Sequence, residues 1–462
     1  MKTVLALLLC ASGLLAETPS AIAIRNAKVV PVSGPVLQKG TVVLKNGLIE
    51  AVGENAAIPA DAWVIDGEGL TVYPGLVDGL STIGLPGFGP ATPAAATGRG
   101  GGGGGQRQAA AQTTTPAPFA RGPEDRPQTS SWLRAADQID ASDRRIETAR
   151  NSGYTSSVTF PTRGIFAGQG AVIALAGNER AGSMVIAAPV GQYVSTQPTG
   201  GFGGGFPNAL FGVISYIRQI YLDADQYQKA KAMYAADPRG MARPPYDRAL
   251  EGVIESPRIL MPGRHFVEID RNILLAKEFK QSLVLYGGHD GYRAADLLKQ
   301  GGTTVLVSLK WPERARDADP DENQTMKEIT LRDKAPSTPA VLAKAGVKFA
   351  FYTDGVEGRA NVYKAVRKAI ENGLSFDAAL KAMTLSPAEI FGVSDRLGSI
   401  EKGKIANIIV TKGDLFQDKT EVKYIFVDGV KYEPAPEEPP AGAGGRPGGA
   451  PTTPNDNQGG NQ

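Results

Sequence analysis

Short apolar segments alternate with longer helical segments through the middle of this chain, and this alternation constrains the fold more than any other feature. Short apolar strands with helices between or after them predict an α/β fold, in which both faces of a parallel sheet are covered. Residues 71–395 have room for eight βα units, which predicts a TIM-type (β/α)8 barrel. The apolar segments are 157–160, 172–175, 258–261, 283–286, 304–307 and 348–352, and the helical segments are 140–151, 211–236, 270–279, 291–300, 338–345 and 359–371.

Both ends of the chain are rich in short strands that are joined by tight turns. Two β-prone runs flank Asn46-Gly47, a dipeptide that favours a type I′ hairpin turn. Asp428-Gly429 stands between two further runs of the same kind near the C-terminus. We therefore expect the two ends to pair into one small β-sandwich.

Glycine and proline, 57 and 33 of 462 residues, are concentrated in two segments. Residues 84–128 hold 18 glycines and prolines among 45 residues, and residues 433–462 hold 14 among 30. Neither composition buries enough apolar surface to offset the entropy of ordering the chain, which predicts a flexible insertion and a disordered tail. The insertion follows the first barrel strand directly, so it emerges where substrates enter such a barrel. A lid, a partner-binding arm and inert filler all remain open as its role.

The N-terminus has the pattern of a secretory signal peptide. Lys2 precedes the apolar run from Val4 to Leu9, and small residues end the segment near Ala16. We therefore expect a periplasmic or secreted protein. The run is too short to span a bilayer, and no later stretch is long and apolar enough to do so. Because Cys10 is the only cysteine, the folded part contains no disulfide.

The charge balance indicates no polyelectrolyte partner. Lysine and arginine number 49 against 47 aspartates and glutamates, which argues against nucleic-acid binding.

The expected organisation is a signal peptide at 1–16, a composite β-sandwich at 17–70 and 396–432, a barrel at 71–395 that carries the insertion 84–128, and a tail at 433–462.

Three motifs bracket nearly the whole expected mature chain. They are Tyr-Pro-Gly-Leu-Val-Asp-Gly at 73–79, Leu-Ser-Pro-Ala-Glu-Ile-Phe-Gly at 385–392 and Leu-Gly-Ser-Ile-Glu-Lys-Gly-Lys-Ile-Ala-Asn at 397–407. In these motifs the chain resembles the amidohydrolase superfamily, especially its imidazolonepropionase-like and cyclic amidohydrolase members. The resemblance implies a barrel with a composite sandwich. It also implies hydrolysis of carbon–nitrogen bonds by one or two divalent metals at the C-terminal mouth of the barrel.

The residues at the family's metal-binding positions are mostly unable to bind metal. The first strand of active relatives ends in His-x-His, and the matching positions hold Leu80 and Thr82. Pro262 and Gly287 stand where the fifth and sixth strands supply histidines, and only the eighth-strand aspartate is kept, as Asp354. No fourth-strand lysine for a carbamate bridge is evident. Catalytic zinc is usually held by three protein ligands, so this set predicts a lost metal site.

The two histidines of the chain leave one alternative open. His265 and His289 follow Pro262 and Gly287 closely, so they could meet Asp354 in a two-histidine, one-carboxylate zinc site. The plain interpretation gives each histidine an ordinary loop hydrogen bond. In the same way, Asp290 is expected to cap the helix that starts at 291.

We expect lesser roles for three polar side chains near the first strand. Ser81 and Thr82 are possible nucleophiles, but no motif places a general base beside them. Asp78 is expected to be structural and to bind backbone groups at the barrel rim. Asp354 is the expected catalytic residue, with a cap or turn role before Gly355 as its plain alternative.

Two functions remain open from the sequence. The first is a non-catalytic or weakly active member that binds a small amide-type ligand or supports a related amidohydrolase subunit, with no cofactor. The second is an active hydrolase of carbon–nitrogen bonds, other than peptide bonds, in cyclic or dipeptide-like amides. The second function requires one divalent metal, zinc, at the rebuilt site.

Overall fold

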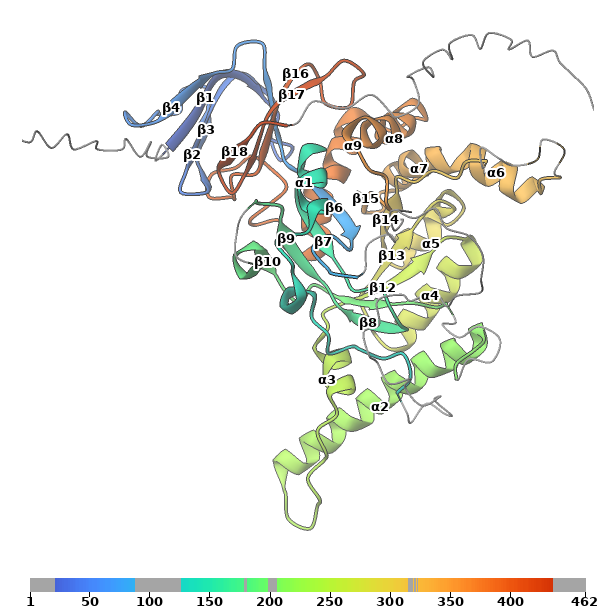
Figure 1. Ribbon diagram of the computed structural model, residues 1–462. Helices are drawn as coiled ribbons and strands as arrows, with labels where there is room; N and C mark the ends of the chain where they lie inside the picture. The colour runs from blue at the N-terminus through green and yellow to red at the C-terminus, as the bar shows by residue number, and fades with distance from the viewer. Residues whose placement is uncertain are drawn as a thin grey trace, which may run out of the picture.

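The computed structural model describes residues 21–87, 126–177, 181–197, 206–314, 319, 321 and 323–434. A β-sheet built from the two ends of the chain lies beside an α/β body (Figure 1). The predicted signal peptide 1–16 falls outside the described residues, as do most of the predicted insertion 84–128 and most of the predicted tail 433–462.

The terminal sheet joins strands from both ends of the chain. Its hydrogen-bonded order is β18-β17-β16-β5-β1-β2-β3, and β4 pairs with β1. The two ends meet where β5 and β16 pair antiparallel, so they associate as expected. The ladders place these strands in one sheet, and its division into the two layers of a sandwich stays a prediction. The strands are β1 (Ala21–Val29), β2 (Leu37–Lys45), β3 (Leu48–Gly53), β4 (Trp63–Asp66), β5 (Thr71–Pro74), β16 (Ile408–Lys412), β17 (Glu421–Val427) and β18 (Val430–Tyr432).

The hairpin turns have the predicted conformation. Asn46 and Gly47 have φ angles of 52° and 77°, and Asp428 and Gly429 have 51° and 77°. Positive φ at both central residues defines the type I′ turn, whose twist matches that of the flanking strands.

The strands of the body form two further sheets, which confirms the α/β class. One sheet has the order β10-β9-β7-β6, and the other has the order β15-β14-β13-β12-β11-β8. Strands β11 to β15 run parallel, as do β6 and β7. The strands are β6 (Leu76–Ser81), β7 (Tyr154–Thr159), β8 (Phe166–Gln169), β9 (Ala171–Ala174), β10 (Val185–Ala187), β11 (Gln192–Val194), β12 (Ile259–Gly263), β13 (Leu283–Gly287), β14 (Thr304–Ser308) and β15 (Phe349–Tyr352).

The strands follow a barrel-like order, but the predicted closed ring is not formed by their ladders. Within the described ranges, the hydrogen-bonded pairing stops at β6 on one side and at β15 on the other, although these two strands are in contact. The other break lies at Gly170, where the chain passes from β8 into β9 and so from one sheet to the other. Antiparallel pairs, β7 with β9 and β8 with β11, replace parallel ones around this break.

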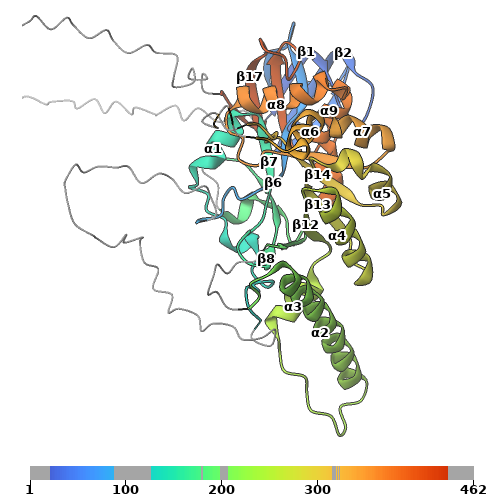
Figure 2. The same ribbon diagram turned by 90° about the vertical axis from the view of Figure 1, so that its right-hand side faces the viewer.

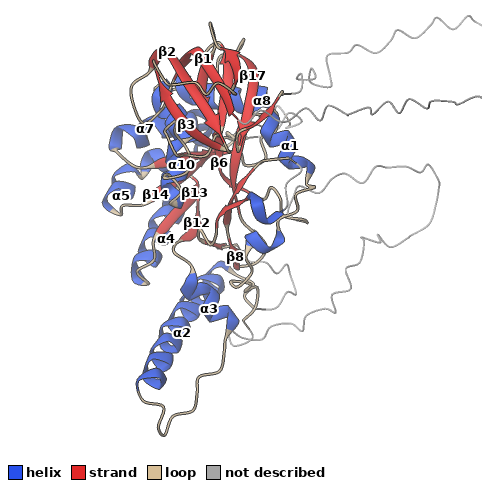
Figure 3. Cartoon of the chain, turned by 90° about the vertical axis from the view of Figure 1, so that its left-hand side faces the viewer, coloured by secondary structure: helices blue, strands red, loops and turns tan. Residues whose placement is uncertain are grey.

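Helices surround the body sheets, as Figures 2 and 3 show, while α2 and α3 project away from them. No helix within the described ranges combines the length and the apolar character that crossing a bilayer requires. The helices are α1 (Arg144–Asn151), α2 (Leu210–Ala236), α3 (Arg248–Glu255), α4 (Phe266–Glu278), α5 (Ala295–Gln300), α6 (Met326–Lys334), α7 (Thr338–Ala345), α8 (Arg359–Glu371), α9 (Phe376–Met383) and α10 (Leu385–Phe391).

The body strands enclose an apolar core. Val77, Val158, Leu260, Val284 and Leu306 come from five different strands, are almost fully buried and belong to one cluster. Because these side chains fill the space between the strands, a ligand site can form only where the strands end.

Candidate functional site

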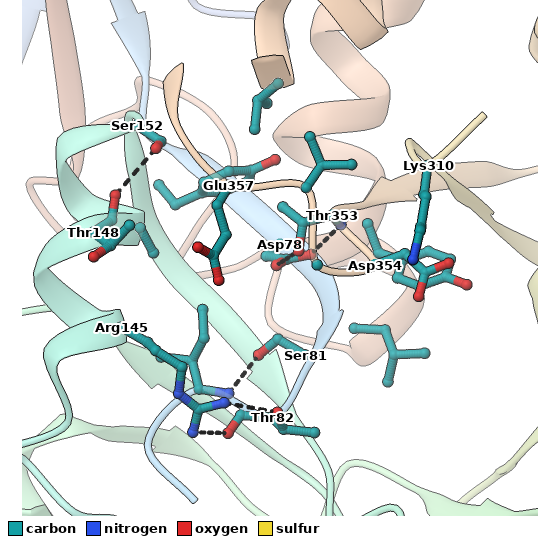
Figure 4. Close-up of a pocket in the computed structure, with 18 of the residues that line it drawn as sticks. Asp78, Ser81, Thr82, Arg145, Thr148, Ser152, Lys310, Thr353, Asp354 and Glu357 are labelled. Atoms are coloured by element: carbon teal, nitrogen blue, oxygen red, sulfur yellow. Dashed lines mark hydrogen bonds between the residues drawn. The ribbon is translucent and has the colours of Figure 1, made fainter. Parts of the chain in front are cut away.

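A cavity of about 560 Å³ opens beside the ends of β6 and β15 and is bordered by α1. This volume lies within the range typical of small-molecule sites. Figure 4 shows carboxylates from Asp78, Asp354 and Glu357 and the basic groups of Lys310 and Arg145 around it. The cavity lies at the carboxyl ends of these strands, which is where barrel enzymes place their sites.

Asp78 holds β6 and β15 together on the buried side of this cavity. Its carboxylate accepts hydrogen bonds from the backbone N–H of Thr353 (3.0 Å) and from the Thr353 hydroxyl (2.7 Å). The side chain is 1% exposed, and burial raises the pKa of Asp78 to about 6, with a smaller contribution from the Asp354 charge. The predicted structural role at the rim, bonding to backbone, is therefore what the geometry shows.

Asp354 lies at the mouth of the cavity, two residues after Tyr352, where β15 ends. Its backbone has φ of 50°, and the Ser308 hydroxyl donates a 2.8 Å hydrogen bond to its Oδ2. The side chain is exposed to the cavity and keeps acceptor capacity beyond this one bond. The structure thus places the predicted catalytic aspartate where a ligand can reach it.

The two first-strand positions contribute no metal-binding geometry. Leu80 is 7% exposed and belongs to the apolar core. Thr82 accepts a 2.9 Å hydrogen bond on its hydroxyl and a 2.8 Å bond on its carbonyl, both from the Arg145 guanidinium. Asp143 holds that guanidinium by an ion pair of 2.7 Å. A fixed positive charge therefore stands beside the position where the family has a metal ligand.

The fifth- and sixth-strand positions lie away from the cavity lining. Pro262 is buried in β12, and its carbonyl accepts a 2.7 Å hydrogen bond from Asn272. Gly287 has φ of 101°, and a Cβ there would meet Arg264 Cγ at 3.1 Å. Neither residue has a side-chain atom that can bind a metal ion.

The structure does not bring the two histidines to Asp354 as ligands. His265 is exposed at the start of α4 and does not line the cavity. His289 is bonded through Nε2 to the Ser308 carbonyl (3.0 Å) and packs against Trp311, and burial lowers its pKa. Among the described residues, no group of three histidine, cysteine, aspartate or glutamate side chains is arranged to bind a metal ion.

Asp290 caps a different helix from the one expected. Its carboxylate accepts a 2.8 Å hydrogen bond from the backbone N–H of Phe266, the first residue of α4. The turn that begins at Gly291 receives no side-chain cap from Asp290. The N-terminal end of α4 lies close to the β13–α5 loop in space, a proximity that local sequence does not show.

Three tyrosines of the cavity were missed by sequence reasoning. Tyr193, Tyr286 and Tyr352 come from β11, β13 and β15, which are alternate strands of the body. The rings of Tyr193 and Tyr286 stack with centroids 5.1 Å apart, and the Tyr193 hydroxyl donates to the Tyr286 hydroxyl at 2.7 Å. Tyr286 and Tyr352 stand at the ends of the predicted apolar segments 283–286 and 348–352, which was the available signal, whereas no predicted segment contains Tyr193.

The residues present do not fit the divalent metal that the family uses. Leu80, Pro262 and Gly287 provide no donor atom, and the Thr82 hydroxyl is bonded to a cation. Among these positions Asp354 alone provides a carboxylate, and the described residues contain no group of three side chains arranged to bind a metal, the number that a catalytic zinc site usually has. No reaction step through a metal follows from this arrangement.

Comparisons with known proteins agree with the fold and the motifs. The amidohydrolase family profile matches residues 293–431. The crystal structure of an amidohydrolase from Thermotoga maritima MSB8 is 25% identical and superposes with a TM-score of 0.70, over 89% of this chain and 100% of that one. Another amidohydrolase structure is 16% identical with a TM-score of 0.53, over 90% of this chain and 100% of its own.

A curated relative matches only locally. Adenine deaminase of Moorella thermoacetica is 42% identical over 64 residues, which is 14% of this chain and 10% of that protein. The chain is thus similar to amidohydrolases in two ways: residues 293–431 match the family profile, and the fold superposes on amidohydrolase structures over most of the chain. The family and its structural neighbours support the class of hydrolases that act on carbon–nitrogen bonds.

Proposed function

We propose that this protein binds a small amide-type ligand in the cavity and does not perform metal-dependent hydrolysis. The observation that carries the proposal is the state of the family's metal positions. Asp354 is the single carboxylate there, and Arg145 holds a guanidinium against Thr82. Both the hydroxyl and the carbonyl oxygen of Thr82 accept hydrogen bonds from this guanidinium, so neither is directed towards a metal ion.

The polar groups of the cavity suit an amide. An amide presents an N–H donor and a carbonyl acceptor. Asp354 supplies a carboxylate with free lone pairs, and Lys310 and the Tyr286 hydroxyl supply donors at the same cavity. The tyrosine rings add apolar surface, which is the usual combination in small-molecule sites.

The test compares binding with turnover on the same compounds. Wild-type protein, with and without added Zn²⁺ or Mn²⁺, is titrated calorimetrically with glutarimide, hydantoin and N-acetyl-L-proline, and the mixtures are then assayed for product by chromatography. We expect binding without product, and weaker binding by Asp354→Asn. The exposed variant Lys229→Gln, on the projecting helix α2, serves as the control and binds as the wild type does. Product formation that disappears in Asp354→Asn contradicts the proposal.

Hydrolysis of cyclic or dipeptide-like amides is the second candidate. It is favoured by Asp354, which keeps both its place after β15 and its access to the cavity. In active relatives the matching aspartate binds metal or transfers a proton. The same experiment decides between the two functions, because only hydrolysis gives a product.

Export and a partner subunit complete the proposal. The N-terminal pattern at 1–16 supports a periplasmic or secreted protein, and N-terminal sequencing of the mature chain from a periplasmic fraction tests this. A supporting role for a related amidohydrolase subunit predicts co-purification with a paralogue that has all its metal-binding histidines. A mature chain that still carries residues 1–16 contradicts export.

A further inference from the structure

The tyrosine pair in the cavity has one hydroxyl hydrogen more than its own contacts use. Tyr193 donates to the Tyr286 hydroxyl, so this bond consumes the Tyr193 hydrogen and leaves the Tyr286 hydrogen available. Within the described part of the chain, no further hydrogen-bond partner is found for the Tyr286 hydroxyl. A donor in a partly buried place is expected to have an acceptor, because leaving it unpaired is unfavourable.

The Tyr286 hydroxyl remains a donor at neutral pH. Burial and the neighbouring Tyr193 raise the pKa of Tyr286 well above its ordinary value, so the phenol keeps its proton. Its ring is held at 23° to the Tyr193 ring, which presents a flat aromatic surface. Both side chains line the same cavity as the Asp354 carboxylate.

These three features select a ligand by its chemistry. A hydroxyl donor calls for a neutral or partly negative oxygen, and a flat aromatic surface favours a planar ligand. The Asp354 carboxylate accepts but does not donate, so it calls for an N–H group. An amide is a planar group that carries a carbonyl oxygen and an N–H together, and a cyclic imide or lactam adds a ring face that can pack on the tyrosine rings.

We propose that Tyr286 donates a hydrogen bond to the carbonyl oxygen of a small planar cyclic amide, whose ring packs on the Tyr193–Tyr286 stack. Tyr193 acts as a positioning residue, because its hydroxyl fixes the orientation of the Tyr286 hydroxyl. The phenol thus contacts the carbonyl oxygen that a metal polarises in active amidohydrolases. This inference rests on the proposed ligand-binding function and names the group that recognises the ligand.

The experiment measures glutarimide affinity in three phenylalanine variants by titration calorimetry. Tyr286→Phe keeps the ring but removes the donor, and we expect the Kd to rise about tenfold, as for loss of one hydrogen bond. Tyr193→Phe is expected to have a smaller effect. Tyr216→Phe is the matched control, because it removes a hydroxyl that is bonded to Thr129 and lies outside the cavity lining. Its Kd should stay within about twofold of wild type.

A spectroscopic readout separates a direct contact from a structural effect. The carbonyl stretch of bound ¹³C-labelled glutarimide should lie at lower frequency in wild type and Tyr216→Phe than in Tyr286→Phe. Unchanged affinity and an unchanged carbonyl stretch in Tyr286→Phe contradict this inference while leaving the proposed ligand binding in place. If wild-type protein binds none of glutarimide, hydantoin and N-acetyl-L-proline, both proposals fail.

Discussion

Asp78 joins two strands that share no backbone ladder in the described structure. Its carboxylate bonds both the N–H and the hydroxyl of Thr353, so one side chain supplies the contacts that paired backbones supply elsewhere. Burial nevertheless disfavours the charged form, which is why its pKa is raised from 3.8 to about 6.

The raised pKa makes stability depend on pH in a defined direction. The folded protein binds the Asp78 proton more tightly than the unfolded chain does, so the stabilisation is complete below pH ~4 and is lost as the pH rises through ~6. The difference between a pKa of 3.8 in the unfolded chain and about 6 in the folded protein corresponds to about 3 kcal/mol in the free energy of unfolding. We predict that the wild-type advantage over Asp78→Asn in free energy of unfolding shrinks by about that amount between pH 4 and pH 7.

Denaturant unfolding at pH 4, 5, 6 and 7 measures this difference. Asp225→Asn, on the exposed face of α2, is the control and should show a difference that changes little with pH. A wild-type advantage over Asp78→Asn that stays constant across the range contradicts the proposed cause.

Sequence reasoning identified those residues whose role follows from their place in a motif. Asp78 lies in the motif 73–79 and Asp354 follows the predicted strand 348–352, so the sequence predicts both at the mouth. Tyr286 was missed because its partner, Tyr193, is 93 positions away in the chain. The prediction that Asp290 caps the helix starting at 291 was wrong for the same reason. The helix that Asp290 caps is α4, which lies earlier in the chain.

At the scale of elements, Gly79 allows β6 and β15 to approach each other closely. A Cβ at this position would lie 2.8 Å from the Phe351 carbonyl oxygen, which is closer than side chains tolerate. Because the obstacle is backbone, it cannot move aside without shifting β15.

We predict that Gly79→Ala lowers the free energy of unfolding by about 1–3 kcal/mol, as overpacking does elsewhere. Gly53→Ala is the matched control, since a Cβ at the end of β3 meets nothing within 4 Å. Its effect should stay within about 0.5 kcal/mol. Chemical denaturation of both variants provides the measurement, and equal stabilities would show that the two strands are not in close contact.

The alternation of strands and helices predicted the class of the fold but not the closure of its sheets. Helix and strand periodicity is local, whereas closure depends on whether distant strands meet in register. At Gly170, where the chain passes from β8 into β9, a Cβ would lie 2.3 Å from the Phe160 ring, so only glycine fits at this change of sheet. Such a contact between residues ten positions apart leaves no periodic signal.

At the scale of the whole molecule, the fold is similar to that of an amidohydrolase, whereas most residues at the expected metal positions cannot bind a metal ion. The chain superposes on an amidohydrolase structure with a TM-score of 0.70, and Asp354 lines the cavity at the strand ends. The side chains around Asp354 are instead tyrosines, a leucine and a threonine bound by arginine. Fold and site therefore carry separate information about function.

Metal content tests the central claim most directly. Purified wild-type protein, Asp354→Asn and the surface variant His265→Gln are dialysed to equilibrium against Zn²⁺ or Mn²⁺ and analysed by inductively coupled plasma mass spectrometry. The account predicts well below one ion per chain, with no difference between wild type and Asp354→Asn. About one ion per wild-type chain, lost in Asp354→Asn but kept in His265→Gln, would contradict it.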